Sequence, residues 1–140
     1  MNYLNKIIAS VTFLFSLVVY IMTMAPTTSF WDCGEFIATS VIMGVPHPPG
    51  TPFYLLLGNF FSQLPTFSDI GARVNLISPI FSAFAVMFLY LIIVQLIEEW
   101  RGESKSFSDF LITYGSAFIG ALTFAFTDSH WFNAVEAEVY

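Results

Sequence analysis

Three segments of the chain contain no Asp, Glu, Lys or Arg, and each is long enough to cross a lipid bilayer as a helix. These segments are residues 7–24, 74–97 and 110–127. The hydrocarbon core of a bilayer needs about 20 helical residues, within a range of about 17 to 25. Charged residues make up only 10% of the chain, whereas ordinary soluble domains carry about 25%. The sequence therefore predicts an all-α integral membrane protein with three transmembrane helices.

A fourth uncharged region, residues 36–68, is interrupted by prolines and is not expected to cross the membrane. Four prolines and Gly50 lie between positions 46 and 52, and they divide the region into segments 36–45 and 53–64. At a rise of 1.5 Å per residue, the longer segment reaches only about 18 Å. We expect both segments to be short interfacial helices within one outer loop.

The distribution of Lys and Arg sets the expected orientation, because short cytoplasmic loops carry an excess of these residues. With three spans, Lys6, Arg101 and Lys105 share the cytoplasmic side and only Arg73 lies outside. A fourth span would divide the four cations equally, so the three-span layout is favoured. That layout gives an outer loop at residues 25–73, an inner loop at 98–109 and an outer segment at 128–140.

The third span carries small side chains at a spacing of four residues. Ala117, Ala121 and Ala125 form one row, and Ser116 and Gly120 form the row beside it. Small residues at this spacing let helices approach each other closely in lipid. The pattern predicts that the third span packs tightly against another helix.

The charge balance argues against a nucleic-acid partner. Four Lys and Arg residues stand against ten Asp and Glu residues, which gives a formal net charge of −6. The sequence therefore has no basic stripe for nucleic-acid phosphates.

Cys33 is the only cysteine, so it cannot form an internal disulfide. Membrane lipid is the expected surrounding partner.

Asp32 and Glu35 are two carboxylates three residues apart in the predicted outer loop, a spacing that puts them on one face of a helix. The structural interpretation is a capping box, in which Asp32 accepts the Glu35 N–H and Glu35 reaches back. The catalytic interpretation is that two close carboxylates shift each other's pKa, which suits one of them to proton transfer. The spacing favours capping, and the two roles are compatible.

Residues 46–52, Pro-His-Pro-Pro-Gly-Thr-Pro, cannot form a regular helix or strand because proline fixes φ and lacks an N–H donor. Thr51 is predicted to cap the next helix, with Pro52 at its first position. The free N–H groups of that helix start would suit an anion such as a phosphate, and His47 lies close in sequence. A stiff connector with an exposed His47 explains the segment equally well.

Arg73 is the only cation in the predicted outer loop, and it directly precedes the second span. An arginine at this position commonly extends its side chain to the lipid headgroups. It is also the obvious partner for an anionic lipid phosphate. Both interpretations stay open at this point.

Four blocks of sequence, in their order and spacing, resemble a known family. The blocks are Asp32-Cys-Gly-Glu35, Val45-Pro-His47-Pro-Pro-Gly50-Thr-Pro-Phe-Tyr, Arg73-Val-Asn75-Leu, and Trp131 followed by Glu136-Ala-Glu138-Val-Tyr140. The family is a multi-pass, protein O-mannosyltransferase-like family of GT-C glycosyltransferases, found in Bacteroidetes-type bacteria and in animals. The resemblance covers only the N-terminal part of these much longer proteins.

The resemblance implies a GT-C-like helical bundle whose first outer loop carries an acidic motif at the mouth of the active site. Such enzymes take a sugar from a polyprenyl-phosphate carrier and add it to an acceptor hydroxyl, here of a protein Ser or Thr. The reaction would take place on the periplasmic side of a bacterial inner membrane. By analogy, Asp32 would be the general base and Glu35 would orient the acceptor or Asp32.

The remaining candidate residues would bind substrate. His47, the helix start at Gly50 and Thr51, and Arg73 would hold the lipid phosphate. Glu138 would contact the sugar or the acceptor. No residue is assigned to a metal, and no cofactor is certain beyond the lipid-linked sugar donor, although a divalent metal ion is left open.

The alternative function is a non-enzymatic one, a small membrane subunit or a piece of a transporter. Transport predicts ionisable residues inside the spans, and the three uncharged segments have no Asp, Glu, Lys or Arg. This favours the enzyme. Because family members are much longer, we expect a truncated fragment with little activity of its own.

Overall fold

The computed structural model describes residues 3–48, 50–102 and 106–137, and within these ranges the chain forms helices and no strands. Three stretches are long and apolar enough to cross a membrane. They are α1 (Tyr3–Thr23), α4 (Ile70–Asn75) with α5 (Ile77–Arg101), and α6 (Phe107–Phe110) with a π-helical turn (Leu111–Gly115) and α7 (Ser116–Ala125). The predicted fold class is confirmed: an all-helical membrane protein with three potential spans and shorter helices.

The helix α5 extends beyond the uncharged segment that predicted it. It continues through Glu98 and ends at Arg101, so the first residues of the expected inner loop are helical. Arg101 pairs with Asp109 at 3.6 Å, and the Tyr114 hydroxyl donates to Glu98 at 2.9 Å. These contacts connect the C-terminal end of α5 to the first part of the helical stretch that follows it.

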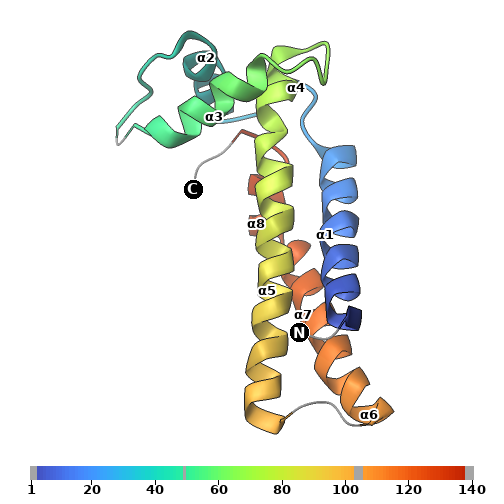
Figure 1. Cartoon of the computed structure of the whole chain (residues 1–140). Coiled ribbons are helices and arrows are strands. Elements are labelled where there is room, and N and C mark those ends of the chain that lie inside the picture. Colours follow the sequence, from blue (N-terminus) through green and yellow to red (C-terminus); the bar gives the residue numbers. More distant parts are fainter. Residues whose placement is uncertain (1–2, 49, 103–105, 138–140) are drawn as a thin grey trace.

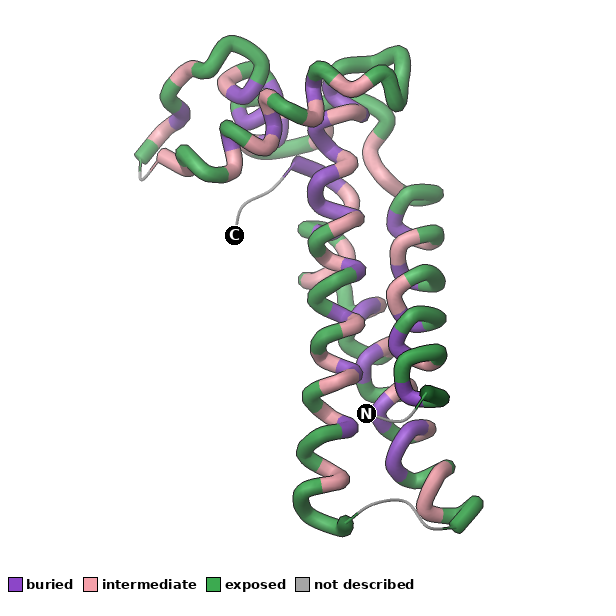
Figure 2. The backbone as a smooth tube through the Cα atoms, in the orientation of Figure 1, coloured by how far each residue is buried: buried purple, intermediate pink, exposed green. Residues whose placement is uncertain are grey.

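The bundle core lies where α1, α5 and α7 meet. Ala117, Ala121 and Ala125 are completely buried and pack with residues of α1 and α5, which confirms the close packing predicted from their spacing. Ser116 and Gly120, in the neighbouring row, are exposed. Along the bundle, each long helix presents a narrow buried stripe and a wide exposed face (Figure 2). A wide apolar exposed face is what a lipid-facing helix requires.

Three short helices form a layer at one end of the bundle, opposite the end at which α5 ends and α6 begins (Figure 1). They are α2 (Cys33–Ile42), α3 (Pro52–Ser62) and α4, and we call them the three-helix layer. α2 and α3 overlap the two segments expected as short helices, residues 36–45 and 53–64, but α2 begins three residues earlier than expected and α3 one residue earlier. They approach closely because Gly58 has no side chain, and a Cβ there would lie 2.7 Å from the Cβ of Ser40.

After the third long stretch, the chain forms α8 (Asp128–Ala134) and then runs towards the three-helix layer. α8 packs against α5 and α7. Beyond α8, the Val135 carbonyl accepts the Ala25 N–H at 2.8 Å. The segment after α8 is thereby joined to the segment that leaves α1, next to α2.

Candidate active site

The start of α2 and the proline-rich turn after it bring three ionisable side chains together, those of Asp32, Glu35 and His47. Asp32 directly precedes α2, and Glu35 lies in its first turn. α2 ends at Ile42, and the next residue, Met43, adopts a left-handed conformation with φ 52°. The chain then returns along α2, so that His47 contacts Glu35, twelve residues earlier in the sequence.

Glu35 holds His47 through both of its carboxylate oxygens. Oε1 accepts the backbone N–H of His47 at 2.9 Å, and Oε2 lies 2.8 Å from Nδ1 of the His47 ring. Since a carboxylate can only accept, this second hydrogen bond requires a proton on Nδ1. The expected capping box was wrong, because the Asp32 side chain makes no capping hydrogen bond. The Glu35 carboxylate is directed to His47 instead of back to Asp32.

The hydrogen bonds from His47 favour the charged form of Glu35. The side-chain hydrogen bond, and then the backbone one, lower the pKa of the Glu35 carboxyl below its ordinary value. On the other side of the ring, Nε2 of His47 lies 3.9 Å from Oδ2 of Asp32, which is too long for a hydrogen bond. The side chains of Asp32 and Glu35 are 48% and 40% exposed, so a ligand can reach both carboxylates.

The cluster has a donor set that could hold a metal ion. One ligand atom from each of Asp32, Glu35 and His47 can be chosen so that all three lie within 4.8 Å of one another. Carboxylate oxygens with one imidazole nitrogen suit a divalent ion such as Mn²⁺ or Zn²⁺. The sequence pattern predicts no metal ligand here, because His47 joins the two carboxylates only through the return of the chain after α2.

The proline-rich turn leads into α3 as expected. Gly50 has φ +76°, a conformation that residues with a Cβ rarely adopt, and its N–H donates to the His47 carbonyl at 3.0 Å. Thr51 is the residue before α3 and Pro52 is its first residue, as predicted, but the Thr51 side chain makes no capping hydrogen bond. The start of α3 borders a largely apolar cavity of about 610 Å³ between α3, α5 and α8.

Arg73 is directed to backbone carbonyls at the end of α3 and in the loop between α3 and α4. Its Nε donates to Phe67 O at 2.7 Å, and its two terminal nitrogens contact Ser62 O at 3.1 Å and Ser68 O at 3.5 Å. These contacts hold the loop in place and are separate from the Asp32–Glu35–His47 cluster. Phosphate binding by Arg73 stays a prediction. Glu138 lies outside the described residues.

Sequence reasoning missed His130, which lines the 610 Å³ cavity together with Asn133 of the same helix. Among the described residues, its Nε2 atom is buried without a hydrogen-bond partner. Burial lowers the pKa of the His130 ring, which favours the neutral form. The sequence feature that could have identified His130 as a candidate is its position next to Trp131, just after the third span.

The fold and the cluster define a helical membrane protein with a solvent-accessible carboxylate–histidine site at one end of its bundle. A sequence profile of the family described as "Protein O-mannosyl-transferase TMEM260 N-terminal domain" matches residues 32–140. The chain belongs to this family. The matched region begins at Asp32 and includes Glu35 and His47.

Two relatives support the assignment. The chain is 27% identical over 126 residues to "Protein O-mannosyl-transferase tmem260" of Dictyostelium discoideum. The aligned region covers 88% of this chain and 14% of the relative. It is 28% identical over 122 residues to "Protein O-mannosyl-transferase TMEM260" of Mus musculus, covering 87% of this chain and 15% of the relative. The chain thus spans about one seventh of these relatives. No solved structure matches it.

Proposed function

We propose that this chain forms the N-terminal part of a glycosyltransferase that moves a sugar from a polyprenyl-phosphate carrier to a Ser or Thr hydroxyl of a protein. The sugar proposed is mannose, after the names of the two relatives. The observation that carries the proposal is the accessible cluster of Asp32, Glu35 and His47, which lies within the region matched to the family. The cluster would face the periplasm of a bacterial inner membrane.

Asp32 is the general base in this mechanism. Its carboxylate accepts the proton of the acceptor hydroxyl as the hydroxyl oxygen attacks the anomeric carbon. The new oxygen–carbon bond forms while the bond from that carbon to the phosphate oxygen breaks, and the carrier leaves as polyprenyl phosphate. Asp32 suits this role because its side chain is 48% exposed and makes no capping hydrogen bond, so the carboxylate is available to an incoming hydroxyl.

Glu35 acts on the site through His47. Its carboxylate binds the backbone N–H and the Nδ1 side of the ring, so the opposite ring nitrogen, Nε2, faces Asp32. With a proton on both ring nitrogens, His47 attracts the Asp32 carboxylate across 3.9 Å and contributes to holding the carrier phosphate, together with the start of α3 at Gly50 and Thr51. Arg73 is proposed to assist from the adjoining loop, and Glu138 to contact the sugar or the acceptor.

A divalent metal ion held by the same cluster would supply positive charge for the departing phosphate. The carboxylate and imidazole atoms are close enough to bind one. The base mechanism of Asp32 requires only that one of its two oxygens stays free for the acceptor hydroxyl.

The test is Asp32→Asn in the full-length protein, assayed in membranes for transfer of labelled mannose from a lipid-linked donor to an acceptor peptide. Transfer is expected to fall by about 100-fold or more, the range in which a general base contributes. Asp69→Asn is the matched control, because the Asp69 carboxylate caps α4 by accepting the Ala72 N–H and is not part of the cluster. Near-normal turnover by the Asp32 variant would remove this residue from the mechanism.

A further inference from the structure

Asn75, the last residue of α4, lies completely buried where four segments of the chain meet. Its Nδ2 group donates to the Ala25 carbonyl at 2.9 Å and to the Thr27 carbonyl at 2.8 Å. Both carbonyls belong to the segment that connects α1 to Asp32. One amide group therefore fixes the approach of the chain to the acidic motif.

The other end of the same amide holds two further segments. Oδ1 of Asn75 accepts the Ala137 N–H at 3.1 Å and contacts Sγ of Cys33 at 3.7 Å. Cys33 directly follows Asp32, and Ala137 directly follows Glu136. Cys33 and Ala137 are also packed in the same buried cluster. A single oxygen atom thus joins the neighbours of two carboxylates that are far apart in the sequence.

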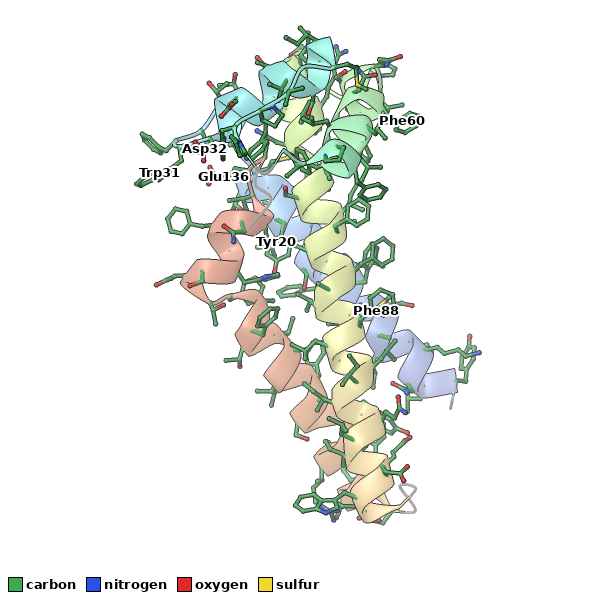
Figure 3. The ribbon with its side chains drawn as sticks, turned by 90° about the vertical axis from the view of Figure 1, so that its left-hand side faces the viewer. Tyr20, Trp31, Asp32, Phe60, Phe88 and Glu136 are labelled. Atoms are coloured by element: carbon green, nitrogen blue, oxygen red, sulfur yellow. The ribbon has the colours of Figure 1, made fainter. Side chains whose placement is uncertain are left out.

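Glu136 is only 8% exposed, which is unusual for a carboxylate. It lies in the short segment after α8, between Val135, which accepts the Ala25 N–H, and Ala137, which donates to Asn75. Both flanking residues are therefore attached to elements that position Asp32. Figure 3 shows Asp32 and Glu136 at the same end of the bundle, on one side of α5.

We propose that Asn75 is a positioning residue of the active site, which fixes Asp32 and Glu136 relative to each other without touching substrate. This inference rests on the proposed function and adds Glu136 to its site. Both donors and the acceptor oxygen of the Asn75 amide are engaged. Because a displacement of about 1 Å at a catalytic group can cost about 100-fold in rate, loss of this amide is expected to lower kcat more than it raises KM.

The first experiment compares Asn75→Leu with Asn59→Leu in the full-length protein. Asn59 is the matched control, since its Nδ2 group also donates to two carbonyls, those of Ser40 at 3.0 Å and Val41 at 3.2 Å. Those carbonyls lie at the end of α2 that is remote from Asp32. At equal amounts of folded protein, Asn75→Leu is expected to lower kcat at least tenfold with donor KM changed less than twofold. Asn59→Leu is expected to lower kcat less than threefold.

A second experiment separates this inference from the proposed function, because it needs no activity. Hydrogen exchange followed by mass spectrometry is expected to become faster at residues 25–36 and 130–137 in Asn75→Leu, and to stay unchanged along α5. Asn75→Asp keeps an acceptor for the Ala137 N–H and loses the paired amide donors. Exchange in that variant is expected to rise at residues 25–33 and to change less at Ala137. The same variant reports on positioning if Asn75→Leu fails to fold.

Two results would overturn the positioning role. One is equal loss of kcat in the Asn75 and Asn59 variants in proportion to the folded fraction, which would make Asn75 a general stabilising residue. The other is exchange that rises uniformly over the protein or does not rise at all. A wild-type protein without sugar transfer, but with the expected local exchange pattern, would instead refute the proposed function and leave the structural role of Asn75 intact.

Discussion

Replacing Tyr20 by Phe tests how the first and third spans are held together. The Tyr20 hydroxyl, on α1, donates to the carbonyl of Ala125 at 2.8 Å, and both residues are completely buried. Ala125 is the last residue of α7, so its carbonyl belongs to the group that a helix leaves without an internal partner. Phe keeps the ring contacts with Phe126 and Trp131 and removes only the hydrogen bond.

The expected cost follows from the position of this bond. Side-chain hydrogen bonds between membrane helices average about 0.6 kcal/mol and reach about 1.7 kcal/mol, while a buried acceptor left without a partner costs about 1–3 kcal/mol. Because Tyr20→Phe leaves the Ala125 carbonyl unpaired inside the bundle, we expect a loss of about 1–2 kcal/mol in the free energy of unfolding.

Tyr90→Phe is the matched control on α5. Tyr90 is as deeply buried as Tyr20, but its hydroxyl has no hydrogen-bond partner among the described residues. Removing a buried hydroxyl without a partner removes a desolvation cost, so this variant is expected to be neutral or more stable. The two substitutions are chemically identical. Their changes in the free energy of unfolding are expected to differ in sign or by at least about 1 kcal/mol.

The measurement is unfolding of the chain in mixed micelles, with an increasing fraction of a denaturing detergent. The fluorescence of Trp131, in a chain with Trp31 and Trp100 replaced by Phe, follows the transition, since the Trp131 ring lies 6.0 Å from that of Tyr20. Equal midpoints for the two variants, or a larger loss in Tyr90→Phe, would refute the reasoning. It would mean that the Tyr20 hydroxyl does not hold α7 against α1.

Three further outcomes are expected. The pKa of Glu35 is lowered by His47, so the Glu35–His47 interaction is complete above about pH 4.5 and is lost as the pH falls through the lower, folded-state pKa. Hydrogen exchange at the His47 amide is therefore expected to accelerate in wild type as the pH falls through that value. In Glu35→Gln, exchange at this amide is expected to lose this pH dependence. Gly58→Ala places a Cβ 2.7 Å from that of Ser40 and is expected to cost about 1–3 kcal/mol in a thermal or detergent unfolding assay, whereas Gly115→Ala, with open space around it, is expected to be close to neutral. A reporter fused after Gly102 is expected on the cytoplasmic side, and a periplasmic signal would reverse the predicted orientation.

The long helices and their packing could be predicted from local patterns. An uncharged segment of sufficient length identifies a span, because a charged side chain in lipid is costly wherever the partner helices lie. Ala117, Ala121 and Ala125 identify a packing face for a similar reason, since small side chains at one helical spacing allow close approach. The positions of the helix ends were predicted less accurately, because charged residues such as Glu98 continue a helix beyond the apolar segment.

The cluster could be predicted only in part. The spacing of Asp32 and Glu35 places them on one helical face, but it also fits a capping box, and local sequence does not decide between the two. Glu35 does not form the capping box, because its carboxylate binds both the backbone N–H and a ring nitrogen of His47. That geometry depends on the left-handed turn at Met43, a conformation that sequence reasoning does not expect from a methionine.

Asn75 marks the limit of what a single sequence reveals about this site. Its four partners lie 42 to 62 positions away, so neither helical periodicity nor a short motif connects them. A polar residue at the junction of α4 and α5 could equally have capped a helix or faced lipid headgroups. Complete burial requires that its amide be satisfied within the protein, and the backbone groups that satisfy it belong to the segments that carry Asp32 and Glu136. If both carboxylates serve the reaction, their relative position depends on a residue that contacts neither of them, and substitution of Asn75 should impair transfer while leaving the cluster chemically complete.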